Sequence, residues 1–216
     1  MELYIDTANI SHIKDLYNSK LISGVTTNPS LMAKEGVRGT ENCQNHYVEI
    51  CNIVDGPVSA EVLSTDASGM LIEGKALAAL HQNIVVKIPM TVEGIKTIHA
   101  LTEKGIKTNC TLVFSATQAL LAAKAGATFV SPFIGRLDDV GENGLELITS
   151  IRNIFDNYKF STKILAASVR TNKHIISCAE LGADVATIPY SLLEPMFIHP
   201  LTTKGLDKFL EDAKKL

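Results

Sequence analysis

The chain has 216 residues, of which 46% are hydrophobic and 20% charged, with 14 glycines and 7 prolines. This usage is typical of a globular protein with a sizeable core and excludes a disordered or collagen-like chain. At about 150 residues per domain, the length favours one compact domain over residues 1–216. The 20 basic and 23 acidic side chains leave a net charge of −3. No basic field is therefore available to bind nucleic acid or an anionic membrane, and an anionic ligand would need a few placed cations.

The spacing of the cysteines and the first residues of the sequence indicate the cellular compartment of the protein. The four cysteines form no C-x-x-C pair, and their spacing resembles neither a zinc site nor a disulfide framework. The six histidines are scattered without the spacing of metal ligands. Acidic residues stand at positions 2 and 6, where a signal peptide would be basic and then apolar. No apolar stretch is long enough to span a bilayer. We therefore expect a cytoplasmic protein with no metal site and no membrane partner.

Eight short runs rich in apolar and β-branched residues predict strands, because each lies between turn or charge signals. In chain order they cover residues 3–5, 22–25, 58–63, 84–88, 108–114, 129–133, 163–167 and 184–189. Segments with the apolar spacing of helices separate them. The 216 residues divided among eight units give 27 residues per unit, about the length of a strand followed by a helix. This order predicts a small (β/α)8 barrel. A doubly wound open sheet also alternates strands and helices, but no G-x-G-x-x-G follows any strand.

Two stretches depart from the simple alternation. The interval between the second and third strands holds two helical segments, 30–34 and 41–54, which read as a short insertion. Beyond the eighth unit, residues 203–216 place apolar side chains along one helix face and predict an additional amphipathic C-terminal helix. This helix could cap the barrel or pack on a neighbouring subunit.

Polar side chains follow or close most of the predicted strands, where barrels of this kind carry their chemistry. They are Asp6, Asn28, Glu61, Lys87, Asn109, Thr111, Ser131, Ser168 and Arg170, with Phe133 and Arg136 close by. Pairs separated by two residues, such as Asn109 and Thr111, face the same side of their strand. We therefore expect these side chains to converge at one end of the barrel.

Lys87 is the most informative of these residues. An ammonium group within Val-Val-Lys-Ile-Pro loses hydration, which lowers the pKa of the lysine towards the neutral, nucleophilic amine. Such an amine can form a Schiff base with a carbonyl. The alternative is a lysine at a strand end whose amine simply reaches solvent. The surrounding polar residues favour the first interpretation.

The other candidates also have structural alternatives. Asp6 could be a general acid/base or the N-cap of the following helix. Asn28, before Pro29, is typical of an N-cap as well. Glu61 lies inside a strand, where a carboxylate is costly without a partner. Arg136, with Ser168 and Arg170, could bind a phosphate, or Arg136 could be a surface residue paired with the neighbouring aspartates.

Six segments, taken in order, resemble the transaldolase family over nearly the whole chain. They are residues 6–8, 24–30, 85–89, 108–114, 131–136 and 166–170. The chain is similar to the short, single-domain branch that also contains fructose-6-phosphate aldolase, and the resemblance implies the same (β/α)8 TIM barrel. It also implies sugar phosphate substrates and no metal or organic cofactor. Short members of this family form ring-shaped homo-oligomers, commonly pentamers stacked as decamers, with the last helix on a neighbour.

The resemblance implies a role for each candidate. Lys87 would form a Schiff base with the C2 carbonyl of a ketose, and Asp6 would be the general acid/base at the C4 hydroxyl. Glu61 and Thr111 would hold a water that shuttles protons. Asn28, Asn109 and Ser131 would bind the hydroxyls of the dihydroxyacetone unit, and Arg136, Ser168 and Arg170 would bind the phosphate.

Two positions distinguish transfer from aldol cleavage. Aldolases of the family carry glutamine at the position of Glu61 and tyrosine at the position of Phe133. A phenol could help to protonate the enamine, whereas a phenyl ring has no proton to donate. We therefore expect a transaldolase that makes erythrose 4-phosphate and fructose 6-phosphate from sedoheptulose 7-phosphate and glyceraldehyde 3-phosphate. The alternatives are a fructose-6-phosphate aldolase and a non-catalytic phosphosugar-binding barrel, in which Lys87 only pairs with an acidic residue.

Overall fold

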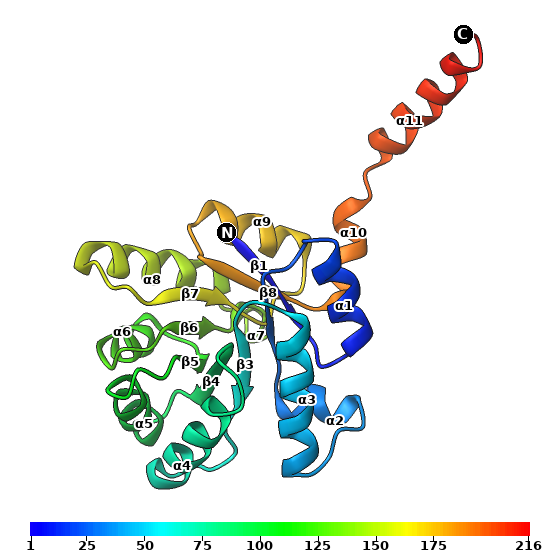
Figure 1. The fold of residues 1–216 in the computed structure, drawn as a ribbon. Coiled ribbons are helices and arrows are strands. Elements are labelled where there is room, and N and C mark those ends of the chain that lie inside the picture. The colour runs from blue at the N-terminus through cyan, green and yellow to red at the C-terminus, as the bar shows by residue number, and fades with distance from the viewer.

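Eight parallel strands close a barrel in sequence order in the computed structural model, which describes residues 1–216 (Figure 1). The strands are β1 (Glu2–Asp6), β2 (Gly24–Thr26), β3 (Val58–Glu61), β4 (Ile84–Pro89), β5 (Thr108–Val113), β6 (Phe129–Pro132), β7 (Lys163–Ala166) and β8 (Val185–Ile188). Strand β1 pairs with both β2 and β8, and this pairing excludes an open sheet. The prediction of a (β/α)8 barrel is confirmed, with each strand within three residues of its predicted bounds.

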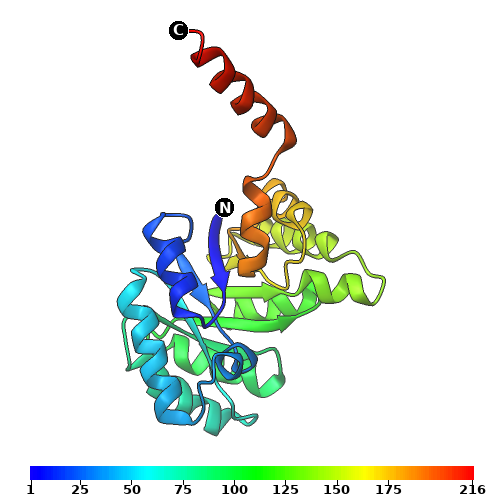
Figure 2. The same cartoon turned by 90° about the vertical axis from the view of Figure 1, so that its right-hand side faces the viewer.

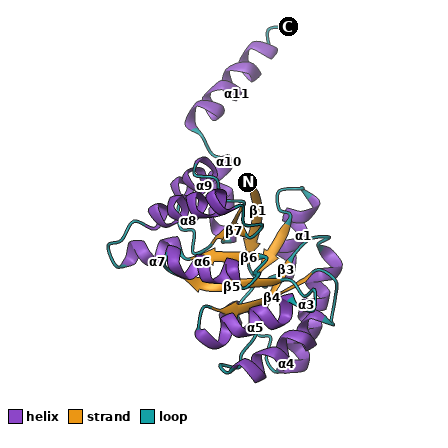
Figure 3. Cartoon of the chain, turned by 90° about the vertical axis from the view of Figure 1, so that its left-hand side faces the viewer, coloured by secondary structure: helices purple, strands orange, loops and turns teal.

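The helices surround the strands, which lie at the centre of the molecule (Figure 3). They are α1 (Ile10–Asn18), α2 (Pro29–Lys34), α3 (Thr40–Ile53), α4 (Ala67–Ala78), α5 (Val92–Thr102), α6 (Ala116–Lys124), α7 (Ile134–Asp139), α8 (Gly144–Tyr158), α9 (Asn172–Glu180), α10 (Leu193–Phe197) and α11 (Pro200–Ala213), with a 3-10 turn η1 (Tyr190–Leu192). Side chains such as Asn9, Thr91 and Ser115 cap the first turns. The predicted insertion is present as α2 and α3. None of the helices combines the length and the apolar character needed to cross a membrane.

The buried apolar residues form two clusters. The larger cluster contains 44 residues from strands and helices and joins the helices to the barrel. The smaller cluster is formed by strand residues only: Tyr4, Val85, Phe129, Leu165 and Val185. A Cβ atom at Gly24 would lie 2.7 Å from the Tyr4 ring, so the glycine makes room for that ring between the strands. Since alternate side chains of a strand face the same side, the residues two positions further along these strands face the barrel interior as well.

The C-terminal helix differs from its predicted bounds. It covers Pro200–Ala213 instead of 203–216, because the His199 side chain accepts a hydrogen bond from Leu201 N and Pro200 suits the first turn. It extends away from the barrel and has no buried residue (Figures 1 and 2). Leu206, Phe209 and Leu210 are exposed. Within one chain, this helix therefore does not cap the barrel.

Candidate active site

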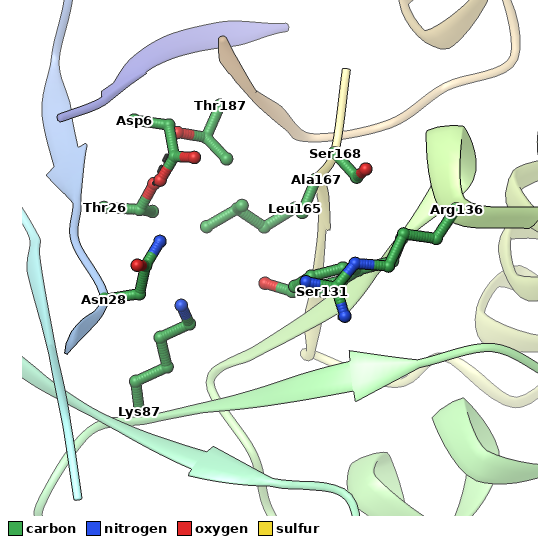
Figure 4. Close-up of a pocket in the computed structure, with 11 residues that line it drawn as sticks. Asp6, Thr26, Asn28, Lys87, Ser131, Arg136, Leu165, Ala167, Ser168 and Thr187 are labelled. Carbon is green, nitrogen blue, oxygen red and sulfur yellow. Dashed lines mark hydrogen bonds between the residues drawn. The ribbon is translucent and has the colours of Figure 1, made fainter. Parts of the chain in front are cut away.

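A cavity of about 140 Å³ lies among the carboxyl ends of the strands. Its lining residues come from six strands and from the segments that follow them: Asp6, Thr26, Asn28, Lys87, Ser131, Phe133, Arg136, Leu165, Ala167, Ser168 and Thr187. Figure 4 shows the Lys87 side chain extending towards the centre of this group, with Asn28 and Ser131 on either side. Seven of the eleven predicted site residues are therefore brought together here. Glu61, Asn109, Thr111 and Arg170 do not line the cavity.

The chemical character of the cavity follows from the alternation of side chains along the strands. Asp6, Lys87, Ser131 and Thr187 each stand two residues after a member of the small apolar cluster. The barrel interior thus has an apolar layer beneath and a polar layer above, at the end where barrel enzymes place their sites.

Lys87 is only 6% exposed. Its Nζ donates to the Thr27 carbonyl oxygen at 3.0 Å and lies 3.0 Å from Glu61 Oε2. The alternative of a lysine that reaches solvent is therefore wrong. Lys87 is thus the partner that a carboxylate inside a strand, such as that of Glu61, requires. Removing one member of such a buried pair leaves the other charge uncompensated, which is strongly destabilising.

Asp6 lies across the cavity from Lys87 (Figure 4). Its Oδ1 accepts a hydrogen bond of 2.8 Å from Thr26 Oγ1. Burial raises the pKa of Asp6 above its usual 3.8; the charge of Lys87 and the Thr26 hydroxyl act in the opposite direction, and the charge of Glu61 raises the pKa further. Asp6 is not a helix cap, because the N-cap of α1 is Asn9.

Asn28 has both functions that its sequence context suggested. Its Oδ1 accepts from Leu31 N at 3.0 Å and caps α2. The residue also lines the cavity, between Thr26 and Lys87 in Figure 4. Because the cap uses only the oxygen, the Nδ2 group remains a donor for a ligand.

Asn109 and Thr111 are both buried on β5, and Asn109 contacts a residue of the cavity lining. Ser131 Oγ donates to Asn109 Oδ1 at 2.8 Å, and Asn109 Nδ2 donates to Ser59 Oγ at 3.2 Å. All three residues are buried. Asn109 therefore fixes the Ser131 hydroxyl from behind. Thr111 Oγ1 is buried and has no hydrogen-bond partner in the protein. A buried hydroxyl without a hydrogen-bond partner raises the free energy of the folded protein. A hydrogen bond from a water or a ligand group to Thr111 Oγ1 would therefore be favourable.

Arg136 lies at the edge of the cavity, where its guanidinium stands 4.9 Å from the centre of the Phe133 ring. It pairs with neither neighbouring aspartate, since Asp138 contacts His174 and Asp139 contacts Arg170. Arg136 is exposed, as the surface alternative expects, but the ion pair with a neighbouring aspartate is absent.

Arg170 has a different environment from Arg136. Both of its terminal nitrogens donate to the Asp139 carboxylate, and its side chain is 48% exposed.

Ser168, by contrast, lines the cavity in a left-handed backbone conformation with φ of 57°. A Cβ atom at Gly135 would lie 2.2 Å from the Ser168 carbonyl oxygen. Glycine at position 135 thus lets the start of α7 approach the end of β7, which brings Arg136 near Ser168.

Four further residues that line the cavity were not predicted from the sequence: Thr26, Leu165, Ala167 and Thr187. The signal was available for Thr26, which precedes Asn28 by two residues and therefore faces the same side. Thr187 lies in the run 184–189, where a single threonine among apolar residues looks like ordinary strand composition.

The raised pKa of Asp6 predicts a pH-dependent effect on stability. Above pH 3.8 the unfolded chain ionises this carboxyl more readily than the folded chain does, so the ionised group favours unfolding. We expect Asp6→Asn to increase the free energy of unfolding at pH 8, and the gain to shrink as the pH falls towards 3.8. Denaturant titrations of both proteins at one protein concentration measure it. The exposed Asp15→Asn is the matched control. A less stable Asp6→Asn at pH 8 would mean that attraction to Lys87 outweighs burial.

The chain is similar to known proteins over its whole length. Residues 3–216 match the family model described as transaldolase/fructose-6-phosphate aldolase. Proteins named probable transaldolase from Bacteroides thetaiotaomicron and Bacteroides fragilis are each 58% identical over 100% of this chain and 99% of their own length. One from Porphyromonas gingivalis is 55% identical over 100% of this chain and 98% of its own. The chain belongs to the transaldolase/fructose-6-phosphate aldolase family.

Proposed function

We propose that this protein is a transaldolase that transfers a dihydroxyacetone unit from sedoheptulose 7-phosphate to glyceraldehyde 3-phosphate, giving erythrose 4-phosphate and fructose 6-phosphate. The observation that carries the proposal is the buried Lys87 amine, 3.0 Å from Glu61 and facing Asp6 across a polar cavity. The relatives named probable transaldolase support it over the whole length of the chain.

The first part of the proposed reaction joins the sugar to the enzyme. The Lys87 ammonium loses a proton to Glu61, the carboxylate beside it, and the free amine attacks the ketose C2 carbonyl. The resulting carbinolamine loses its C2 hydroxyl as water and becomes an iminium ion. Glu61 and Thr111 hold the water that carries protons in these steps, and the unpartnered Thr111 hydroxyl supports this role.

The second part breaks and remakes a carbon–carbon bond. Asp6 takes the proton of the C4 hydroxyl, the C3–C4 bond breaks, and its electron pair moves onto the iminium nitrogen to form an enamine. The aldehyde leaves and the acceptor aldehyde enters. The enamine attacks its carbonyl carbon, and Asp6 returns the proton to the new alkoxide. A carboxyl whose pKa is raised by burial is a stronger base than an ordinary aspartate.

The remaining polar residues bind the sugar. Asn28 Nδ2 and the Ser131 hydroxyl face the cavity and hydrogen-bond the hydroxyls of the dihydroxyacetone unit, while Asn109 holds Ser131. Arg136 and Ser168 bind the phosphate at the edge of the cavity. Arg170 joins them only by giving up its bonds to Asp139.

Glu61 and Phe133 favour transfer over release of free dihydroxyacetone. Phe133 lines the cavity and has no proton to donate, so the enamine persists until an acceptor arrives. The second candidate is a fructose-6-phosphate aldolase with the same lysine. A phosphosugar-binding barrel without turnover is the candidate from another class, in which the Lys87–Glu61 pair is only structural.

Borohydride trapping tests the Schiff base directly. After incubation with fructose 6-phosphate and reduction, peptide mapping is expected to find a dihydroxyacetone-sized adduct on Lys87, because reduction converts the iminium into a stable amine. Lys87→Ala should give no adduct. Lys96→Ala, which removes an exposed lysine on α5, should be trapped like the wild type. Sugar binding without any adduct would favour the binding-protein alternative.

Adding an acceptor separates the two enzymatic candidates. A transaldolase forms sedoheptulose 7-phosphate from fructose 6-phosphate and erythrose 4-phosphate much faster than it releases free dihydroxyacetone. A release rate equal to the transfer rate would identify an aldolase instead.

The placement of Arg136 predicts a phosphate-specific effect. Losing one charged hydrogen-bonding group costs about 1.5–3 kcal/mol, so we expect Arg136→Gln to raise KM for fructose 6-phosphate roughly 10- to 100-fold. The variant should bind unphosphorylated fructose as the wild type does. Steady-state kinetics on both sugars measure this, with Arg38→Gln, an exposed arginine before α3, as the control. Equal losses with both sugars would contradict phosphate binding by Arg136.

We also propose that the protein is a homo-oligomer, a pentamer or decamer, in which α11 packs on a neighbouring subunit. The exposed apolar side chains of α11, with Phe209 at 72% exposure, support this because their burial would be favourable. We expect deletion of residues 200–216 to reduce the particle mass measured by light scattering. Phe209→Asp should weaken the assembly, whereas Lys208→Asp, a change beside it, should leave it intact. An unchanged mass after the deletion would contradict the proposal.

We further propose a cytoplasmic location. All four cysteines are free, and three of them are buried. Burial raises the pKa of Cys51 and of Cys178 to about 11, so these thiols stay protonated and unreactive, as suits residues that fill a core.

A further inference from the structure

Thr187, on the last strand of the barrel, has a buried hydroxyl that the proposed reaction leaves unused. Its side chain lines the cavity and the residue is 3% exposed. Thr187 Oγ1 lies 2.6 Å from Thr26 Oγ1, and Thr26 Oγ1 lies 2.8 Å from Asp6 Oδ1. Figure 4 shows the three side chains grouped on the side of the cavity opposite Lys87. Hydroxyls from β8 and β2 thus meet at the carboxylate of the strand between them, β1.

The direction of these hydrogen bonds follows from the number of protons available. An ionised carboxylate can only accept, so the single proton of the Thr26 hydroxyl is donated to Asp6. Thr26 therefore has no proton left for Thr187 and must accept from it. The chain of hydrogen bonds therefore runs from Thr187 through Thr26 to Asp6. Without Thr187, the Thr26 oxygen would lose its donor in a buried site, which is unfavourable.

This chain of hydrogen bonds also fixes the position of the Asp6 carboxylate. Thr26 is the register partner of Asp6 on β2, and Thr187 is the partner of Tyr4 on β8. Threonine is branched at Cβ, so its χ1 angle is restricted, and both threonines stand on paired strands. The Thr26 hydroxyl, itself bonded to Thr187, holds Asp6 Oδ1. This leaves Oδ2, with no hydrogen bond from the protein, for a substrate proton.

We propose that Thr187 is a positioning residue for Asp6, acting through Thr26. The inference builds on the proposed function, in which Asp6 moves the proton at the substrate C4 hydroxyl. It assigns a role to a strand, β8, that otherwise contributes no polar group to the site. If Thr187 instead touched the substrate, its effect would be independent of Thr26. This difference makes the two roles separable.

A double-mutant cycle provides the test. We expect Thr187→Val, which has nearly the same shape, to lower kcat for sugar exchange about fivefold, the effect of one hydrogen bond, with little change in KM. Thr26→Val should lower kcat further and move the acidic limb of the kcat profile to higher pH, because loss of a donor to the carboxylate raises the pKa of Asp6. The double variant should match Thr26→Val, since Thr187 acts only through Thr26.

The controls separate the hydroxyl from packing and folding. Thr187→Ser keeps the hydroxyl and should retain wild-type kcat. Thr162→Val removes a buried hydroxyl that directly precedes β7 and donates to the Ala127 carbonyl oxygen. This variant should leave the pH profile unchanged. Additive losses in the double variant, a rise in KM alone, or a Thr187→Ser as impaired as Thr187→Val would overturn the proposal. Borohydride trapping on Lys87 is run in parallel: an untrapped wild type contradicts the proposed function, whereas trapping without coupling contradicts only this inference.

Discussion

Closure of the eight strands into one barrel is the constraint on which the site depends. Side chains fill most of the interior of a closed barrel of this size, and each strand points every second side chain into it. Tyr4, Val85, Phe129, Leu165 and Val185 use that room as an apolar layer. The side chains at the next inward positions along the same strands lie close to one another. Polar residues placed there, such as Asp6, Lys87 and Ser131, therefore converge without any further folding device.

The site keeps its two acidic residues in different electrostatic environments. Glu61 is paired with Lys87 at 3.0 Å, whereas Asp6 has only hydroxyl donation and a more distant positive charge to offset its burial. Two carboxylates near one amine can thus serve different steps, because one is paired with the amine and the other faces it across the cavity. The hydroxyl chain from β8 continues this division, since it acts on Asp6 and not on the Lys87–Glu61 pair.

Sequence reasoning was most accurate for residues whose environment follows from their own strand. Lys87 between Val86 and Ile88 was expected to be desolvated, in preference to reaching solvent, and Glu61 was expected to need a partner; both expectations are confirmed. It was less accurate where a partner comes from another element. Arg136 and Arg170 looked equivalent, yet Asp139 pairs with Arg170 and leaves Arg136 at the cavity. The bounds of α11 shifted because His199, a residue outside the amphipathic pattern, caps the helix.

The sequence by itself determined the eight strands, their order and the polar residues at their ends, because apolar alternation and turn residues act over a few neighbouring positions. Only the tertiary structure decided which polar groups pair. Thr26 and Thr187 are 161 residues apart in the chain and meet at 2.6 Å because β1 pairs with both of their strands. Such contacts depend on strand register around the whole barrel, which no local pattern encodes.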